Sequence, residues 1–531
     1  MRLTKVFGLL LCCAAVTCPG QSTNRLTITG YPALQELPLS LDEAVRLALE
    51  HDLTLQVERY RPVIIGYNVH ALLGAYYDPV VNLQARRDEN TSESGGFNPI
   101  TGAPFPGVES KADSFSGGLG GYLPTGMRYD ILGNASDNSN IRSIFDAGPP
   151  ARTFRTNTET WRADAGIAVT QPLLRNFWTD ASRTGIKLRK RDKRISELEL
   201  EQFVHDTVRD VVEAYYTLVG RLEAVIVAET DLRVKQQNFD ETRRKVEVGT
   251  LAPLDEKKAQ AEVAQAKGNL VQALNDAADA EALLKTRISD QFGRQVGVRI
   301  KPTDKLLVNP AVLDLPTSYT LAMDKRPNLQ ARRETLDRHN IQLKYDYNQL
   351  FPSLDVFASY GVNGLDDDLG GALRDLRRRD FPESSYGVIL NFPLTMKRER
   401  SVWKADKVLK AQLVTELKRE EETAIFEVDN AIRGVSSAYQ LVFVNRERVA
   451  FAEADLAAEQ RKFQAGKSTS FFVLDAASRL AAARNDEIQA LIDYNLALNA
   501  LSHAEGTILD LRKIDFEAVR YPPTYLPKDR R

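Results

Sequence analysis

Residues that commonly catalyse reactions or bind metal ions are few and scattered in this sequence of 531 residues. The three cysteines, Cys12, Cys13 and Cys18, lie near the N-terminus, so the rest of the chain has no thiol nucleophile or thiolate ligand. No GxxxxGK[ST], GxSxG or HExxH motif occurs, and GGLGG at 117–121 precedes no phosphate-binding helix pattern. The sequence therefore predicts no enzyme, no cofactor and no metal site. The five histidines share no spacing typical of metal ligands: His51, His70, His205, His339 and His503.

The N-terminal segment is typical of a secretory signal. Arg2 and Lys5 precede an apolar run of about twelve residues, shorter than the roughly 20 that a membrane-spanning helix needs. We expect residues 1–20 to be a signal peptide. The tetrapeptide AVTC, which ends at Cys18, loosely resembles a bacterial lipobox and would make Cys18 a lipidated N-terminus. Ordinary cleavage near residues 18–21 is the alternative.

Charge and hydropathy narrow the class of protein further. The 70 Lys and Arg residues nearly balance the 72 Asp and Glu residues, which argues against a nucleic-acid partner. After the signal, no stretch of 18 uninterrupted apolar residues occurs, so we expect no membrane-spanning helix. Strands of a β-barrel remain compatible with the sequence, because their alternating residues escape hydropathy scans.

The chain contains two similar halves. RKVEVGTLAP begins at Arg244 and RKFQAGKSTS at Arg461, and each places a glycine after a long helical pattern. Aligning Gly249 with Gly466 brings further blocks into the same order, among them VTQPLL with LNFPLT and LALEHDLTLQ with LAMDKRPNLQ. We therefore predict a tandem duplication. Its parts are a first repeat at 21–290, a connecting segment at 291–317, a second repeat at 318–507 and a C-terminal tail at 508–531.

Each repeat has the same predicted order of helix, strand pair, long helix and helix. A long helix of about 70 residues spans roughly 105 Å, which matches two helices of about 35 residues stacked end to end. We therefore expect each long helix to lie beside two short ones; a plain coiled-coil rod is the alternative. Apolar residues with a helical period mark one stripe of the first long helix: Leu200, Val204, Val208, Val211, Tyr215 and Leu218. The predicted helices are 41–76, 176–248, 253–289, 319–350, 397–465 and 471–505.

Segments of alternating residues lie between these helices, at about 79–172 and about 353–393. Strands of about 9–11 residues can cross a bilayer as part of a barrel, although a small soluble sheet has the same alternation. Whether the hairpin-like pair at 111–138 also spans a membrane is left open. Four or six strands cannot enclose a wide lumen, and no lipid-facing edge can stay unpaired. Spanning strands would therefore require several chains to share one barrel.

The ordered motifs resemble the TolC-like outer-membrane efflux protein family (outer membrane factors). The motifs that carry the resemblance are LSLDEAVRLALEHD, YDPVVNL, VTQPLLRNF, RKVEVGTLAPLDEKKAQAEVAQAK and RKFQAGKSTSFFVLDAASRLAAAR. The resemblance implies a mainly α-helical protein with membrane β-structure. It also implies a homotrimer whose outer-membrane β-barrel continues into a periplasmic α-helical barrel. The expected location is the outer membrane, in contact with its lipid, with a long periplasmic domain.

The resemblance places the two glycine stretches at the tips of the helical hairpins, around the tunnel entrance. Gly249 and Gly466 would end the long helices, and Pro253 suits the first turn of the next helix. Ser468, Thr469 or Ser470 could cap the corresponding helix in the second half. The resemblance gives acidic residues near the tips a role in closing the entrance or lining it as a ring. A solvated surface is the alternative for both carboxylates. The tip residues that the resemblance singles out are Gly249, Pro253, Asp255, Gly466, Phe472 and Asp475.

The sequence departs from the family pattern at the second tip. Phe472 stands where a second ring carboxylate can be, and Phe463 stands where an aromatic hydroxyl can bond to the first hairpin. A phenylalanine ring has no hydroxyl, so we expect closure by other contacts. The implied function is the exit duct of a tripartite efflux or type I secretion system, with a periplasmic adaptor and an inner-membrane pump as partners. An extracytoplasmic coiled-coil adaptor or scaffold without a channel is the alternative.

Overall fold

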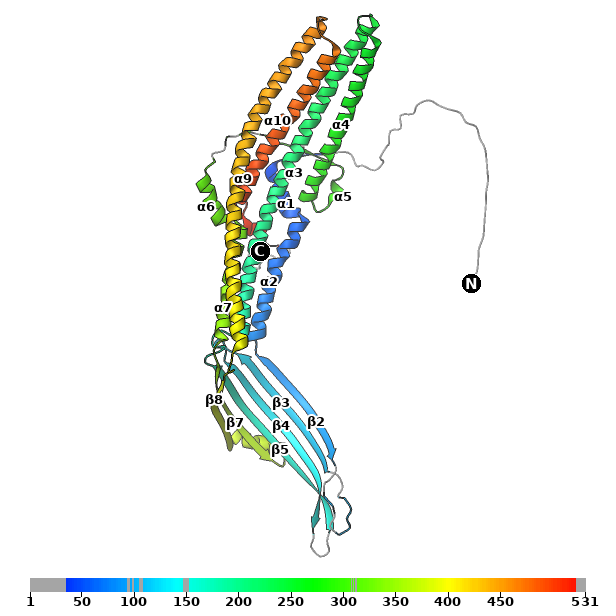
Figure 1. The fold of residues 1–531 in the computed structure, drawn as a ribbon. Coiled ribbons are helices and arrows are strands. Elements are labelled where there is room, and N and C mark those ends of the chain that lie inside the picture. Colours follow the sequence, from blue (N-terminus) through cyan, green and yellow to red (C-terminus); the bar gives the residue numbers. More distant parts are fainter. Residues whose placement is uncertain are drawn as a thin grey trace, which may run out of the picture.

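The computed structural model describes residues 35–92, 96–97, 100–104, 108–146, 152–306, 308, 310 and 313–521. The expected signal peptide and Cys18 lie outside these residues. The molecule is elongated, with long helices at one end and a β-sheet at the other (Figure 1). Among the described residues, no helix combines the length and the hydrophobicity needed to cross a membrane.

The helices and strands alternate along the chain as the duplication predicts. Helices dominate, and the strands fall into two groups. In chain order the elements are β1 (Gln35–Leu39), α1 (Leu41–His51), α2 (Leu53–Tyr77), β2 (Val80–Ser92), β3 (Val108–Tyr122), β4 (Arg128–Asp146), β5 (Arg152–Pro172), α3 (Ala181–Glu247), α4 (Pro253–Ile288), α5 (Phe292–Gln295), β6 (Val298–Pro302), α6 (Leu315–Lys325), α7 (Pro327–Asn348), β7 (Ser353–Asp366), α8 (Leu369–Arg378), β8 (Phe381–Asn391), α9 (Lys397–Gln464), α10 (Ser470–Glu505), α11 (Ile508–Leu511) and α12 (Phe516–Val519).

The long helices α3 and α9 each lie beside two shorter helices, as expected. α3 packs against α2 and α4, and α9 packs against α7 and α10 (Figure 1). α3 also contacts α7 and α10, and these contacts join the two halves of the chain. The predicted apolar stripe of α3 is buried in one hydrophobic cluster, to which α1, α4 and α11 also contribute. This cluster joins the first repeat to the C-terminal tail through Ile508 and Leu509, and a separate cluster packs Val234 of α3 against the second repeat.

The first helix of each half is broken, which corrects two predicted helices. The helix expected at 41–76 divides at Asp52, whose backbone is extended. The Asp52 side chain caps α2 by accepting hydrogen bonds from the Thr54 and Leu55 amides. The helix expected at 319–350 divides at Arg326, because the residue before a proline, here Pro327, disfavours helical backbone angles. α1 and α2 both contact α3, and α6 and α7 both contact α9, so each broken pair still lies along one long helix.

The long helix expected from residue 176 begins at Ala181 instead. Asn176 and Trp178 have positive φ angles of 67° and 54°, which a helix cannot accommodate. Asp180 caps the helix, with its carboxylate accepting from the Arg183 amide at 2.8 Å. The Asn176 amide donates to Asn348 Oδ1 at 2.8 Å, so this irregular segment holds the start of α3 against the end of α7.

The main sheet is antiparallel and contains the predicted strand pair of each half together with the further hairpin-like pair of the first half. Its order is β2-β3-β4-β5-β7-β8, so the first half contributes four strands and the second half two. The additional pair in the first half is β3 and β4, which form the hairpin expected at 111–138 and are strands of the main sheet. The small parallel pair β1 and β6, beside the core of α3, was not predicted.

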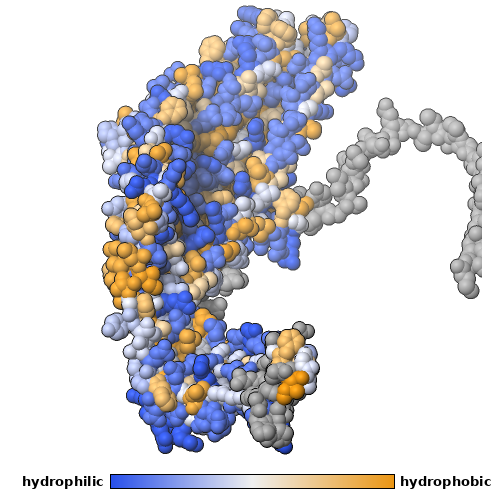
Figure 2. All heavy atoms as spheres, turned by 60° about the horizontal axis from the view of Figure 1, so that its bottom comes forward, coloured by the Kyte–Doolittle hydropathy of each residue, from blue (hydrophilic) through white to orange (hydrophobic). Residues whose placement is uncertain are grey.

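The register of the main sheet separates its side chains into two faces, because residues directly opposite each other point to the same side. The polar face includes Asn82, Gln84, Ser116, Asn134, Asp164 and Ser359. The apolar face includes Val81, Leu83, Phe115, Ile131, Ile167, Tyr360, Tyr386 and Val388. Figure 2 shows exposed hydrophobic residues gathered on the left of the molecule, between the helices and the forward end.

Candidate functional site

Both helical hairpins end in the same type of turn. Gly249 and Gly466 have φ angles of 80° and 71°, in the region where an L side chain would be strained. In the first tip, the Thr250 amide donates to the Lys245 carbonyl and the Gly249 amide to the Val246 carbonyl. The second tip repeats both bonds: the Lys467 amide donates to the Lys462 carbonyl and the Gly466 amide to the Phe463 carbonyl. These paired bonds form a Schellman motif, which satisfies the last carbonyl groups of α3 and α9.

The helices that leave the two tips begin differently. Pro253 is the first residue of α4, and the N-cap Ala252 offers no side-chain hydrogen bond. Thr469 occupies the N-cap of α10, but its side chain makes no capping hydrogen bond. Ser468 instead donates to Glu459 Oε2 at 2.7 Å. The hydrogen bond from Lys462, together with the one from Ser468, lowers the pKa of Glu459. Ser468 and Ser470 are therefore used for contacts other than the expected cap.

The two acidic residues singled out by the sequence lie in one pocket. Asp255 of α4 and Asp475 of α10 both line it, together with Lys258 and Glu262. Asp475 also forms an ion pair with Arg479 at 3.0 Å, and Arg479 pairs with Asp455 of α9. Half of the Asp475 side chain is exposed. The structure thus brings the two hairpins' carboxylates to one surface and gives one of them an intrachain cation.

Phe472 is not among the residues that line this pocket, whereas its neighbour Phe471 is. Its side chain is 51% exposed and packs edge-to-face against Phe471, with ring centroids 5.6 Å apart. Two exposed aromatic side chains next to a pocket provide an apolar surface at the end of the molecule.

A contact between Lys245 and Phe463 joins the tips, and the sequence did not reveal it. The Lys245 ammonium donates to the Phe463 carbonyl at 2.9 Å and lies 3.4 Å from the centroid of the Phe463 ring. Phe463 is 3% exposed. Cation–π attraction and a charge-assisted hydrogen bond therefore act on the same residue pair. The sequence shows that Phe463 lacks a hydroxyl, but only the structure shows what replaces such a bond.

A second set of contacts ties α3 to the start of α10. The Asn238 amide donates to Ser470 Oγ at 2.7 Å, and the Thr242 hydroxyl approaches the same oxygen at 3.2 Å. All three side chains are buried. One turn away, the buried Lys235 lies 3.3 Å from both Asp231 and Glu262. Buried polar groups need such partners, so these contacts fix the relative positions of the hairpins near their tips.

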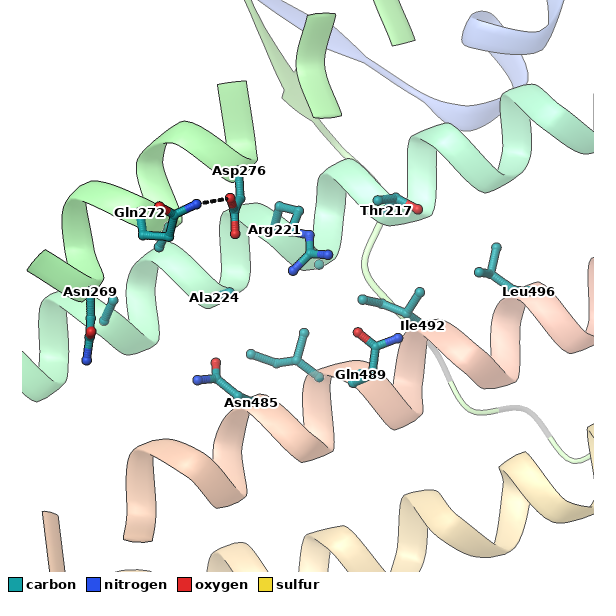
Figure 3. A pocket seen from close by; sticks show the side chains of 14 residues that line it. Thr217, Arg221, Ala224, Asn269, Gln272, Asp276, Asn485, Gln489, Ile492 and Leu496 are labelled. Carbon is teal, nitrogen blue, oxygen red and sulfur yellow. Dashed lines mark hydrogen bonds between the residues drawn. The ribbon is translucent and has the colours of Figure 1, made fainter. Parts of the chain in front are cut away.

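A polar pocket lies midway along the helices, between α3, α4 and α10 (Figure 3). Its labelled side chains include Arg221, Gln272 and Asp276 from the first hairpin and Gln489 and Ile492 from α10, and Gln272 donates to Asp276 at 2.7 Å. At its floor, a Cβ on Gly220 would collide with the Ile492 side chain. The pocket therefore lies where a glycine allows α3 and α10 to approach each other closely.

The histidines have structural neighbours of different kinds. His503 Nε2 lies 2.7 Å from Asp206 Oδ1, and His339 Nε2 lies 2.8 Å from the Asp406 carbonyl. Burial, with the charge of His503, lowers the pKa of His205 to about 4. No group of three potential metal-ligating side chains occurs in the described part of the chain.

Comparison with known proteins agrees with this architecture. The family model for outer membrane efflux proteins matches residues 134–288 and 319–507, which is more than half of the chain. Outer membrane protein TolC of Vibrio cholerae is 21% identical over 371 residues, covering 69% of this chain and 82% of that protein. Outer membrane efflux protein BepC of Brucella suis is 24% identical over 383 residues, covering 70% and 77%.

Solved structures show the same fold. The outer-membrane channel OprN superposes with a TM-score of 0.63 at 15% identity, covering 88% of this chain and 90% of that one. The Campylobacter jejuni CmeC outer membrane channel also gives a TM-score of 0.63, at 13% identity, covering 92% and 90%. The predicted family and fold class are confirmed: the chain belongs to the outer membrane efflux protein family, whose members are outer-membrane exit ducts of efflux systems.

Proposed function

We propose that three copies of this chain form a passive exit duct, with their main sheets closed into one β-barrel in the outer membrane and their helices forming a periplasmic tunnel. The observation that carries the proposal is the division of the main sheet into an apolar face and a polar face. A barrel that spans a membrane needs such a sheet, because its outer face meets lipid and its inner face meets water.

The edges of the sheet support sharing of one barrel between copies. β2 and β8 are the outermost strands, and an unpaired edge cannot face lipid. Neighbouring strands in this sheet run in opposite directions and the sheet contains an even number of strands, so β2 and β8 are antiparallel to each other. β8 of one copy can therefore pair with β2 of the next and continue the same antiparallel pattern.

The helices supply the second part of the duct. α3 has 67 residues and α9 has 68, so each is about 100 Å long. The hairpin tips lie at the end farthest from the sheet (Figure 1). We place the contacts with a periplasmic adaptor and an inner-membrane pump at these tips. The proposed entrance residues are Gly249, Pro253, Asp255, Gly466, Phe472 and Asp475.

The tip carboxylates would determine which ions the entrance admits. Three copies of Asp475 around a narrow opening would produce a negative potential that favours cations. The ion pair with Arg479 reduces the negative potential of Asp475. Asp255 lines the same pocket and adds its own negative charge.

The division into repeats at 21–290 and 318–507, joined by 291–317, is part of this proposal. The duct needs no catalytic step, cofactor or metal ion. A coiled-coil scaffold would use the helices but gives no reason for a sheet with one apolar face.

Disulfide cross-linking between copies tests the shared barrel. The native cysteines all lie within residues 12–18, so introduced cysteines can be followed individually. Chains carrying Ala85→Cys in β2 and one of Ser384→Cys, Tyr386→Cys or Val388→Cys in β8 are oxidised in membranes. We expect at least one pair to give dimers and trimers on a denaturing gel, with nothing larger, because three copies close the ring.

A matched pair controls for random collisions. Ile131→Cys lies on the same face in the interior strand β4, so combined with Tyr386→Cys it should give no intermolecular product. Absence of cross-links for every edge pair, or a ladder extending beyond three chains, would contradict the trimeric barrel.

A further inference from the structure

Helix α8 is the connection between β7 and β8 at the end of the main sheet away from the long helices. It has the sequence LGGALRDLRR, and Asp368 caps its start by accepting from the Gly371 amide at 3.0 Å. The backbone of Arg379 closes its end in a left-handed conformation, with φ of 61°. α8 is therefore an ordered element of the sheet's outer end.

α8 packs on the apolar face of the sheet. A Cβ on Gly364 would collide with the Ala372 carbonyl, so the glycine allows the helix backbone to approach β7. Gly364 is paired with Ala163 of β5, which is fully buried and lies on the apolar face with Phe115 and Ala135. Because the apolar face is the outer surface of the proposed barrel, α8 lies outside the barrel wall.

The side chains of α8 divide into two flanks when successive residues are placed 100° apart. The residues nearest the sheet are Gly371, Ala372 and Asp375. One flank then carries Leu369, Leu373 and Leu376, of which Leu369 and Leu373 are 37% and 48% exposed. The opposite flank carries the exposed Arg374, Arg377 and Arg378, and Arg379 follows. A helix with leucines along one flank and arginines along the other suits a position at a lipid–water interface.

The position of α8 along the sheet agrees with such an interface. β7 begins at Ser353 beside the helices, and Gly364 is eleven residues farther along the strand. At about 3.3 Å per residue and a tilt of roughly 40°, this corresponds to about 28 Å along the membrane normal. The hydrocarbon core of a bilayer is about 30 Å thick. α8 therefore lies at the depth of the outer headgroups.

The arginines of α8 have no ion-pair partners among the described residues, although aspartates are near. Asp366, Asp367 and Asp368 precede the helix, at the end opposite to Arg377 and Arg378. Asp368 is engaged as the N-cap, and Asp366 lies against Gly371. Asp375 lies toward the sheet and Asp380 follows the last arginine, so the four arginines at 374–379 leave a net positive charge at this end of α8, next to exposed leucines.

We propose that α8 is an interfacial anchor whose arginines bind phosphate-bearing lipid headgroups of the outer leaflet while its leucines enter the acyl layer. This inference rests on the proposed position of the sheet in the outer membrane. Guanidinium groups bind phosphate through paired hydrogen bonds, and the neighbouring apolar flank distinguishes a lipid from a free anion. The anchor fixes the depth and rotation of each subunit at the outer surface.

Calorimetric titration of the detergent-solubilised full chain tests the anchor with dihexanoyl phosphatidic acid, dihexanoyl phosphatidylcholine and inorganic phosphate. The triple variant Arg374→Gln/Arg377→Gln/Arg378→Gln should bind phosphatidic acid about a hundredfold more weakly than the wild type, at about fivefold per lost charge. Phosphatidylcholine should show no such difference. The variant Leu369→Ser/Leu373→Ser should weaken binding of the lipid but leave binding of phosphate unchanged.

The matched control removes three exposed cations from the periplasmic helices: Arg332→Gln/Lys418→Gln/Arg419→Gln. It should retain wild-type affinity for phosphatidic acid. Equal affinity of the α8 variant and the wild type, or equally tight binding of phosphate and lipid, would overturn the anchor. Failure of the shared barrel is detected separately, because the β2–β8 cross-links do not depend on the arginines of α8.

Discussion

Asp346 of α7 is a buried carboxyl group with a strongly perturbed pKa. Only 4% of its surface is exposed, and Gln342 donates to both of its oxygens at 3.1 and 3.2 Å. Burial, together with a hydrogen bond to Asp406 of α9, raises the pKa of Asp346 from 3.8 to about 7. The protonated carboxyl group can donate to the Asp406 carboxylate, so the pair connects α7 to α9 when one proton is shared.

This perturbation predicts a pH-dependent stability. A carboxyl group with a raised pKa binds its proton more tightly in the folded state, so its stabilising effect is present below pH 4 and is lost as the pH rises through about 7. Asp346→Asn preserves a donor to Asp406 without the charge. At pH 8 the variant should be more stable than the wild type by about 1–2 kcal/mol. One pKa unit corresponds to about 1.4 kcal/mol, and the effect of the full shift is reduced because solvent screens the partly exposed Asp406.

Thermal unfolding followed by circular dichroism between pH 5 and pH 8 measures the effect. The wild type should lose several degrees of melting temperature across this range, and Asp346→Asn should lose less. Asp337→Asn, at an exposed position of the same helix, is the control. Parallel pH profiles for the wild type and Asp346→Asn would show that the shared proton does not stabilise the contact between α7 and α9.

Residue-scale features divide into those that sequence predicts and those it does not. The turns at Gly249 and Gly466 follow from a glycine at the end of an amphipathic pattern, which is a local signal. The contact between Lys245 and Phe463 joins residues 218 positions apart, and its existence depends on the axial alignment of α3 with α9. That alignment results from packing along the whole helices, so no short motif records it.

At the scale of elements, Gly220 sets the spacing between α3 and α10. Gly220→Ala places a methyl group against the Ile492 side chain, and overpacking of this kind costs about 1–3 kcal/mol. Gly434→Ala, in α9, adds a methyl group where nothing lies within 4 Å. Because alanine favours a helix over glycine by about 1 kcal/mol, this matched variant should be stabilised instead. The melting temperature should fall for Gly220→Ala and rise for Gly434→Ala. A rise for both variants would mean that α3 and α10 can move apart at no cost in stability.

The tip contacts of the two hairpins predict a change in channel opening. Lys245→Met removes the hydrogen bond to the Phe463 carbonyl and the cation over its ring. A hydrogen bond to a charged group contributes about 1.5–3 kcal/mol, so the open fraction should rise about tenfold or more in planar-bilayer recordings. Arg244→Met removes a neighbouring exposed charge and should leave the open fraction unchanged. An unchanged open fraction for Lys245→Met would show that this contact does not hold the tips together.

Most elements could be predicted from the sequence, and the exceptions have identifiable causes. The long helices are readable because their apolar stripes persist for many turns. The breaks at Asp52 and Arg326 could not be predicted from the sequence. A single aspartate or proline within a helical pattern also occurs in helices that continue without a break. β1 and β6 are five residues each and pair across more than 250 residues, so neither alternation nor proximity reveals them.

At the scale of the whole molecule, the two faces of the sheet predict how it meets the membrane. The chain has only three tryptophans, Trp161, Trp178 and Trp403, so replacing two by phenylalanine leaves a single fluorophore. Trp161 lies opposite Asp366 near the outer end of the sheet, on the apolar face. Trp403 lies in α9, beyond the inner end of the sheet.

Quenching by brominated lipids then reports both orientation and depth. In vesicles, the protein with Trp161 alone should be quenched, more strongly by lipids brominated near the headgroup than near the bilayer centre, because Trp161 lies about one hydrocarbon thickness from the helices. The protein with Trp403 alone should keep its fluorescence with either lipid. Quenching of Trp403 but not of Trp161 would reverse the assignment, with the helices in the lipid and the apolar face elsewhere. Strong quenching of Trp161 therefore places the apolar face outside the barrel, which leaves the polar face as the wall of the duct.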